Sequence, residues 1–497
     1  MKSFCQNIAS LMQKDFEKFL IIFIVSCGFS TLCVLMVLKM FPWIYLFALF
    51  PVFFVLLEVS IHIILRIAYG RHYLYSIQNY FIVDHPEYGW CFRKGSSAKK
   101  CAFLLFDKYI FVFGSSRELE IEENERLRKD FNINSLGFRG NGFSPYKKTK
   151  KLRMFCSGGS TTAGLYINDD EGWPAQLEMQ LKEKGFDVEV VNAGVNGWSS
   201  YYEYLRFNNE IQHYQADILL IHQGWNEEFA YSSLSLGKHW KPEVVRNFKE
   251  TSYLYCSPRP FLSKTNWLSI YLTAQAILKT HFFIPNMRFT NPKRWQILKE
   301  SSYIHAWFDN MIKIARIAQE RNILVYTINY PGLVGLNDSS INRSVYIENS
   351  RLTPFFADFQ AASKERIRYV LKTIGSLIDY LDIEEDLSGV QGEERSRLFY
   401  DDIHTTPEGD HLLAQAIGKR LVEDSSFKRK YFARNSQNVL SNVRLNEKLI
   451  QSAKKQLENN PLFLNRFIDN KINSLISIGL QKGHYNLEIP EERYTTF

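Results

Sequence analysis

The chain has 497 residues, with 60 Lys and Arg against 52 Asp and Glu, and a formal net charge of +8. Its hydrophobic content of 46% and charged content of 23% exclude a disordered polar chain and a collagen-like fibre. Seven Cys residues are too few for a disulfide-based scaffold. At about 150 residues per domain, we expect two to four structural units.

Residues 1–72 are predicted to be a membrane anchor with two transmembrane helices, at about 19–38 and 41–65. The first run has 20 residues and no charge, and about 20 apolar residues are what a helix needs to cross a bilayer core. No small-residue cleavage motif follows this run. A retained anchor is therefore favoured over a removed signal peptide.

The predicted location is a membrane. Two spans would form a hairpin, with Lys2, Lys14 and Lys18 before it and Arg66 and Arg71 after it. The positive-inside rule then places the large domain in the cytoplasm. A single span would place that domain on the opposite face, so the side of the membrane stays open.

Residues 73–150 form a mixed lead-in segment before the main domain. Residues 101–113 have the composition of a strand, whereas the charged residues 117–130 favour a helix. Cys91 and Cys101 flank a turn rich in Gly, Ser and Lys, and they could face each other across a hairpin. Sequence alone does not establish a disulfide between them.

From residue 151 to 424, short apolar strands alternate with helices. The predicted strands are 152–156, 188–194, 216–224, 322–330 and 378–382, and the predicted helices are 171–184, 198–214, 303–320, 361–376 and 408–423. This alternation predicts a parallel sheet covered by helices on both faces, with the functional site at the carboxyl ends of the strands. Residues 425–497 are predicted to be a helical, polar tail.

A basic, aromatic insertion at 230–300 interrupts this domain. Residues 240–300 contain ten Lys and Arg against three acidic residues, so most of the net charge lies there. Because the segment leaves the sheet near a predicted active-site loop, it could be a lid or a docking surface for an acyl chain, a sugar or an anionic group. The alternative is a small helical subdomain with an aromatic core and a solvated basic face.

Four loops at the ends of these elements carry chemically useful groups. Ser160 lies in a Gly-rich turn after the first strand, Gly197 follows the second strand and Asn226 follows the third. Asp401 and His404 precede the last helix. A Ser hydroxyl becomes a good nucleophile when a His accepts its proton, and an acidic side chain orients that His. Backbone N–H groups of Ser160 and Gly197 and the amide of Asn226 could stabilise an oxyanion.

A metal site is a less favoured alternative. Asp401, Asp402 and His404 could ligate a divalent ion, but no second pair of His, Asp or Glu at ligand spacing is present in the sequence. The turn around Ser160 is not a phosphate-binding P-loop, because the Gly-x-x-x-x-Gly-Lys spacing is absent. We therefore expect neither a metal nor another cofactor.

Residues 150–424 resemble the SGNH/GDSL hydrolase superfamily of serine esterases and lipases. The resemblance is carried by four blocks: Gly158-Gly159-Ser160, Asn192 to Gly197, Gly224-Trp225-Asn226-Glu227, and Asp401 to His404. Trp173-Pro174 also matches the family's usual start of the first helix. The segment from Ile133 to Gly140 is similar to one that precedes the nucleophile in membrane-anchored bacterial members, which implies a bacterial inner membrane as the location.

The resemblance implies a three-layer α/β/α sandwich with a parallel, flavodoxin-like sheet of five strands, preceded here by two transmembrane helices. It implies Ser160 as nucleophile, His404 as base and Asp401 as the residue that orients the base. It also implies that Ser160, Gly197 and Asn226 form the oxyanion hole.

Two positions depart from the family pattern. Gly159 stands where the family has Asp, and Glu227 stands where it has a second Asp. Neither position belongs to the triad, so the chemistry is kept, but the substrate class becomes harder to infer. Asp402 competes with Asp401 as orienter, and the three-residue spacing to His404 favours Asp401.

The sequence therefore predicts a membrane-anchored serine esterase that hydrolyses O-acetyl or acyl esters of a glycan or lipid through an acyl-serine intermediate. Two alternatives stay open. The same acyl-enzyme could transfer its acyl group to a cell-envelope polysaccharide, or the fold could be an inactive glycan-binding scaffold. The expected partners are the ester-bearing substrate and the membrane. Nucleic acid is not expected, because membrane anchors and an esterase pattern argue against it.

Overall fold

The computed structural model describes most of the chain outside the N-terminal segment, the insertion and the end of the tail. The described residues are 25, 28–31, 52–60, 82–85, 87–102, 128–147, 150–164, 167–227, 302–335, 338, 354–400, 402–433 and 441–459. Within these residues, no helix has both the length and the hydropathy needed to cross a bilayer. Most of the predicted spans 19–38 and 41–65, and the insertion at 230–300, lie outside the described residues.

Five parallel strands form the central sheet in the order β6-β5-β7-β8-β9. They are β5 (Leu152–Gly158), β6 (Val188–Asn192), β7 (Ile218–Gln223), β8 (Leu324–Asn329) and β9 (Asp379–Leu381). All five coincide with predicted strands, so the parallel α/β sheet is confirmed. The first of these five strands along the chain, β5, lies second in the sheet, which is the flavodoxin-like order.

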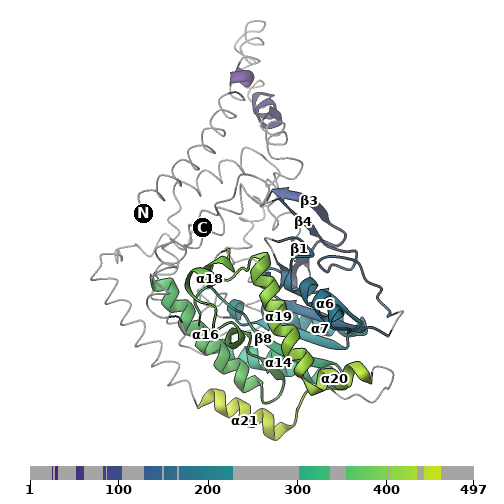
Figure 1. Ribbon diagram of the computed structural model, residues 1–497. Helices are drawn as coiled ribbons and strands as arrows, with labels where there is room; N and C mark the ends of the chain where they lie inside the picture. The colour runs from purple at the N-terminus through teal and green to yellow at the C-terminus, as the bar shows by residue number, and fades with distance from the viewer. Residues whose placement is uncertain are drawn as a thin grey trace, which may run out of the picture.

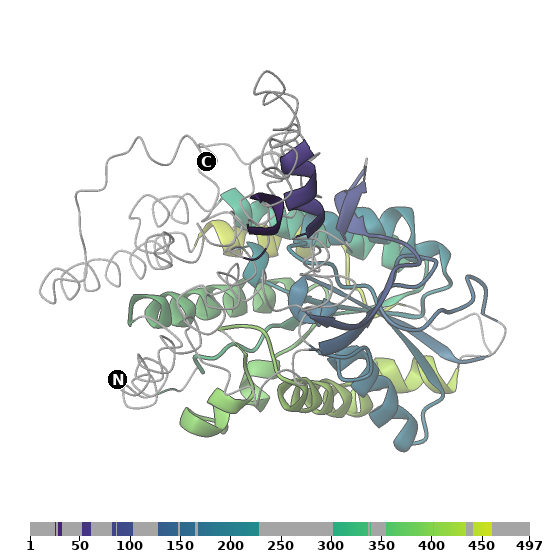
Figure 2. The ribbon, with the colours of Figure 1, turned by 90° about the horizontal axis from the view of Figure 1, so that it is seen from above.

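Helices cover both faces of this sheet, as Figure 1 and Figure 2 show. One layer contains α6 (Trp173–Glu183), α19 (Pro407–Glu423) and α20 (Ser425–Phe432), and the other contains α7 (Ser200–Asn209), α14 (Ser302–Glu320) and α16 (Pro354–Ile374). Neighbouring strand residues point to opposite faces. Met154 and Leu220 are thus buried against the first layer, and Phe155 and Leu219 against the second.

Beyond shifts of one or two residues at element ends, the elements of the main domain differ from the prediction mainly in two helix bounds and two additional helices. The helix predicted at 198–214 ends at Asn209, where two consecutive Asn residues disfavour helix, and a 3-10 turn follows at Ile211–His213. The helix predicted at 361–376 begins earlier, at Pro354, because Pro is well suited to the first turn of a helix. Two short helices that were not predicted, α17 (Ile383–Asp386) and α18 (Gly392–Arg397), lie between β9 and α19.

The lead-in segment contains two antiparallel pairs of strands. β1 (Ile82–His85) pairs with β2 (Gly89–Phe92), and β3 (Ser97–Ala102) pairs with β4 (Arg128–Asn132). The helix predicted at 117–130 is therefore wrong over its last three residues, which belong to the strand that pairs with β3; residues 117–127 lie outside the described part of the chain.

The hairpin proposed for Cys91 and Cys101 is also wrong. Cys91 is in β2 and pairs with Val83, whereas Cys101 is in β3 and pairs with Lys129. The turn between β2 and β3 therefore joins two separate sheets, so the two cysteines are not cross-strand neighbours. Cys91 is a free thiol.

The described part of the C-terminal tail is largely helical. After α20, the amphipathic helix α21 (Glu447–Glu458) packs against α14 and α16 and buries Ala453 and Leu457. Just before it, Asn442 accepts a hydrogen bond from Val325 N and donates one to Asp379 Oδ2, so it links β8 to β9. The tail thus contributes to the main domain.

Candidate active site

The predicted nucleophile, Ser160, begins the one-turn helix α5 (Ser160–Ala163) immediately after β5. A side chain at Gly158 would lie 2.6 Å from the carbonyl oxygen of His222, and one at Gly159 would collide with the amide nitrogen of Asn226. Both glycines are therefore required for the close packing of this turn. The turn is closed by hydrogen bonds from Ala163 N to Gly159 O (3.0 Å) and from Gly164 N to Ser160 O (2.9 Å).

The structure brings the predicted base to the predicted nucleophile. His404 Nε2 lies 2.8 Å from Ser160 Oγ, although 244 residues separate them in the chain. His404 is buried, and its loop is closed by a hydrogen bond from Tyr400 N to the His404 carbonyl (2.7 Å). The distance allows direct proton transfer between the hydroxyl and the imidazole.

The two other predicted oxyanion residues flank this turn. Gly197 has φ of 73°, a conformation that favours glycine, and it follows β6. Asn226 follows β7 and donates one hydrogen bond from Nδ2 to the carbonyl of Trp198 (2.7 Å). Because an amide NH₂ carries two hydrogens, the second remains available for a substrate oxygen.

Asp401, the predicted orienter of His404, lies outside the described residues. Its neighbour Asp402 is buried, and its main-chain carbonyl accepts hydrogen bonds from Leu333 N (2.8 Å) and Gln360 Nε2 (2.6 Å). Gln360 Oε1 in turn accepts from Val334 N (2.8 Å). Hydrogen bonds from α16 and from the loop that follows β8 therefore hold the loop that carries His404.

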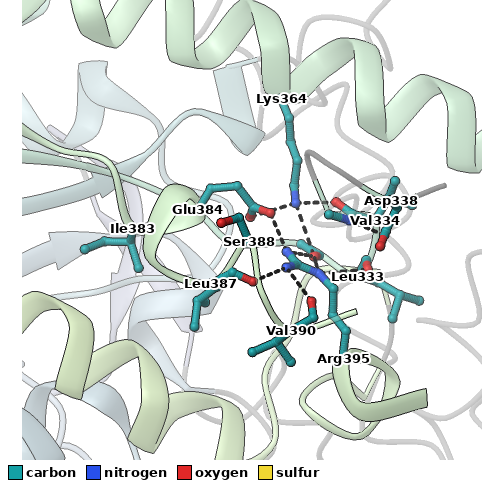
Figure 3. Close-up of polar contacts among 12 residues, drawn as sticks. Leu333, Val334, Asp338, Lys364, Ile383, Glu384, Leu387, Ser388, Val390 and Arg395 are labelled. Carbon is teal, nitrogen blue, oxygen red and sulfur yellow. Dashed lines mark hydrogen bonds and ion pairs between the residues drawn. The ribbon is translucent and has the colours of Figure 1, made fainter. Parts of the chain in front are cut away.

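A buried ion cluster supports that loop after β8 (Figure 3). Glu384 on α17 contacts Lys364 Nζ (2.8 Å) and Arg395 Nη2 (2.6 Å), and all three side chains are at most 2% exposed. Lys364 and Arg395 also donate to the carbonyl of Gly332, at 3.2 and 2.7 Å. Burial lowers the pKa of Lys364 to about 7, although Glu384 acts in the opposite direction.

The lead-in segment reaches the nucleophile turn through Arg139, which is 4% exposed. Its guanidinium donates to the carbonyls of Ala163 and Gly164, at the end of α5, and to that of Ile167 (2.6 Å). Asp169 pairs with its Nε at 3.0 Å. The planar guanidinium of Arg139 thus holds three backbone carbonyls that follow the nucleophile turn in a fixed arrangement.

Two buried acids stabilise the neighbouring helix starts. Asp410 on α19 accepts hydrogen bonds from Trp173 N (2.8 Å), at the start of α6, and from the hydroxyl of Thr405. Burial raises the pKa of Asp410 to about 7. Glu227, which replaces the family's second Asp, accepts from Ser200 N (2.5 Å) at the start of α7. Glu227 therefore supplies an acceptor at the N-terminus of α7.

A second histidine lies behind the nucleophile turn. His222 on β7 is 2% exposed, and its Nδ1 lies 3.2 Å from Thr162 Oγ1. Burial lowers the pKa of His222 to about 3, so the ring is neutral at physiological pH. These contacts point to a packing role for His222 under the turn.

The structure brings Ser160 and His404 together, but sequence reasoning missed the residues that hold their loops. Arg139 lies in the segment from Ile133 to Gly140, whose similarity to anchored family members implies no role for any single residue. Gln360, Glu384 and Asp410 gave no local signal, because polar residues in helices are usually solvated and their partners here are distant in sequence. Among the residues that the structure describes, no group of three or more His, Cys, Asp or Glu is placed to hold a metal ion.

Comparison with known proteins gives the family. The sequence profile of the GDSL-like lipase/acylhydrolase family matches residues 156–412. Curated proteins gave no significant match.

Similar solved structures share low sequence identity with this chain. A lipolytic protein of the G-D-S-L family from Desulfitobacterium hafniense is 12% identical, over 54% of this chain and 99% of that one, with a TM-score of 0.27. A GDSL-like lipase from Bacteroides thetaiotaomicron is 14% identical, over 56% and 91%, with a TM-score of 0.29. A lipase/acylhydrolase from Enterococcus faecalis is 15% identical, over 54% and 94%, with a TM-score of 0.30.

The family profile spans more than half of the chain and includes Ser160, Asn226 and His404. The chain therefore belongs to the GDSL-like lipase/acylhydrolase family and is a serine hydrolase that acts on ester bonds.

Proposed function

We propose that Ser160 is the nucleophile of this hydrolase, His404 its general base and Asp401 the residue that orients His404. The observation that carries the proposal is the 2.8 Å distance between Ser160 Oγ and His404 Nε2. The proposed oxyanion donors are the backbone N–H groups of Ser160 and Gly197 and the side-chain amide of Asn226. The closeness of Asn226 to Gly159 supports this assignment, because it puts the amide beside the nucleophile turn.

In the first half of the reaction, Ser160 Oγ attacks the ester carbonyl while its proton moves to His404 Nε2. The carbonyl oxygen becomes an oxyanion, and the preorganised donors stabilise it more than they stabilise the neutral ester. The tetrahedral intermediate then collapses. The bond to the leaving alkoxide breaks, His404 returns the proton to that oxygen, and the acyl group remains on Ser160.

In the second half, His404 takes a proton from water as the water oxygen attacks the acyl-serine. A second oxyanion forms in the same hole. As it collapses, the bond between the acyl carbon and Ser160 Oγ breaks, His404 returns the proton to Ser160 Oγ, and the carboxylic acid is released. If a sugar hydroxyl replaced water in this step, the protein would be an O-acyltransferase. The groups of the site act in the same way in hydrolysis and in transfer, so the two reactions differ only in whether water or a sugar hydroxyl accepts the acyl group.

We further propose that the enzyme acts at a membrane on O-acetyl or acyl esters of a glycan or lipid. The uncharged run at 19–38 and the apolar run at 41–65 support membrane attachment, because each is close to the length of a bilayer-spanning helix. The aromatic and basic composition of the insertion at 230–300 supports a substrate with an apolar or sugar part near an anionic group.

The proposal is tested by covalent labelling of the detergent-solubilised protein. An active-site phosphonate should modify the wild type at Ser160, as peptide mass mapping would show, and should leave Ser160→Ala unlabelled. Equal labelling of both proteins would contradict the assignment. If Ser160 is labelled but p-nitrophenyl acetate is turned over only after a glycan acceptor is added, transfer is favoured over hydrolysis.

The position before the nucleophile offers a prediction about the oxyanion hole. In Gly159→Ala, the added methyl group would displace the Asn226 amide, so we expect kcat for p-nitrophenyl acetate to fall about 10- to 100-fold, somewhat less than the loss of a whole donor. Gly142→Ala is the matched control, because nothing lies within 4 Å of the position its Cβ would take. Equal kcat values in the two variants would show that the position of the Asn226 amide beside Gly159 does not matter for catalysis.

A further inference from the structure

A tryptophan outside the family region contacts the loop that carries a proposed oxyanion donor. Trp90, on β2 of the lead-in segment, is 1% exposed. Its indole Nε1 donates a hydrogen bond to the main-chain carbonyl of Asn196 at 2.9 Å, across 106 residues of sequence. That carbonyl belongs to the same peptide unit as the N–H of Gly197.

The geometry of a peptide unit makes this contact consequential. The unit is planar and trans, so its C=O and N–H point in opposite directions. A donor that fixes the Asn196 carbonyl therefore also fixes the direction of the Gly197 N–H, which points away from Trp90. Gly197 itself is conformationally permissive, so its own residue type would not hold this plane. A hydrogen bond to the carbonyl also polarises the unit and strengthens its N–H as a donor.

Other contacts connect Trp90 to the second proposed donor. Trp198 Nε1 donates back to the carbonyl of Trp90 at 3.2 Å, so strand and loop exchange two indole hydrogen bonds. The carbonyl of Trp198 accepts from Asn226 Nδ2 at 2.7 Å. Tyr202 on α7 packs against Trp90, with ring centroids 4.7 Å apart. The contact between Trp90 and Trp198 is therefore linked by hydrogen bonds to both the Asn196–Gly197 peptide and the Asn226 side chain.

We propose that Trp90 is a positioning residue for the oxyanion hole. Its indole N–H orients the Asn196–Gly197 peptide and thereby the N–H of Gly197. This inference rests on the proposed roles of Ser160 and Gly197. Trp90 does not touch the substrate in this proposal. It lies before residue 156, where the family profile begins, so the lead-in segment completes the catalytic centre of the hydrolase domain.

The test is Trp90→Phe in the full-length protein. The phenyl ring keeps much of the packing but removes the donor, so we expect kcat for p-nitrophenyl acetate to fall about 10-fold, while KM changes less than about twofold. Loss of a whole donor typically costs about 10² to 10³, and a loosened one should cost less. The affinity of a boronic acid, whose adduct with Ser160 carries a tetrahedral oxyanion-like oxygen, should fall in parallel with kcat/KM. The pH dependence should stay unchanged, because His404 is not affected.

Trp307→Phe on α14 is the matched control. Trp307 is equally buried, and its indole nitrogen has no hydrogen-bond partner among the residues that the structure describes. The same truncation there should leave kcat and boronic acid affinity within about twofold of the wild type. Equal effects of the two substitutions would overturn the proposal, since the loss would then reflect packing alone.

A second variant covers the case in which Trp90→Phe does not fold. Replacement of Trp90 by 3-benzothienylalanine keeps the shape of the ring system and exchanges the N–H for sulfur. A wild-type kcat in this protein would also overturn the proposal. Failure of the proposed function is recognised separately: in that case Ser160 is not labelled by the phosphonate and Ser160→Ala keeps its turnover, whatever the behaviour of Trp90.

Discussion

Ser160→Ala is expected to lower the turnover of p-nitrophenyl acetate by about 10⁴-fold or more, because it removes the atom that forms the acyl-enzyme. The folded state should be unaffected, since the substitution removes the hydrogen bond between Ser160 Oγ and His404 Nε2 and leaves the backbone of the turn in place. Steady-state kinetics together with the thermal unfolding midpoint would check both parts.

The accompanying variants sharpen this result. His404→Ala should lose a similar factor, and the double variant should be hardly slower than either single variant, because the two residues act as one unit. Thr161→Ala, next to the nucleophile, is the control for disturbance of the turn. If the losses from Ser160 and His404 multiplied, the 2.8 Å distance would not represent a catalytic pair.

Glu384→Ala is expected to produce the largest loss of stability. It leaves Lys364 and Arg395, both almost fully buried, without their shared carboxylate, and breaking a buried ion pair typically costs about 3–5 kcal/mol in the free energy of unfolding. Urea denaturation would measure the loss. Glu385→Ala is the control, since this neighbour is 64% exposed and lies 4.0 Å from Arg368, where about 0–1 kcal/mol is expected.

The pH dependence of this loss has a definite sign. Burial already lowers the pKa of Lys364 to about 7, and Glu384 opposes that shift, so the variant should have a still lower Lys364 pKa. The unfolded state binds the lysine proton up to about pH 10.5 in both proteins. The extra cost in the variant therefore arises below about pH 7, where only the wild type keeps the proton on folded Lys364. The destabilisation should be greater at pH 6 than at pH 9, and the same loss at both values would contradict a protonated Lys364.

The sequence predicted the sheet well because strand signals are local. The strands β5 to β8 are short, largely apolar runs that end at or shortly before a Gly or Asn, and their alternate residues fill the two cores. Helix ends were less accurate, as at Asn209, where the end depends on a weak local preference. The strand at Arg128–Asn132 was missed because its charged residues are typical of a helix and only its pairing with Ser97–Ala102 defines it.

In the candidate site too, residues with a local sequence signal were predicted, and residues defined by distant contacts were not. Ser160, Gly197 and Asn226 could be named because each follows a predicted strand, and His404 because it precedes the last predicted helix. The residues behind them could not, because their roles arise from contacts between distant parts of the chain. Trp90 meets Asn196 across 106 residues, and Trp173 meets Asp410 across 237. No local pattern encodes such a pair.

These long separations also bear on how the protein folds. The hydroxyl of Ser160 and the ring of His404 are 244 positions apart in the sequence, and closing such long loops delays the contacts that depend on them. Helices and single strands can form earlier, since their contacts are local. We therefore expect catalytic competence to be acquired after the secondary structure during folding, so that esterase activity would report on the completed tertiary structure more strictly than the helix and strand content does.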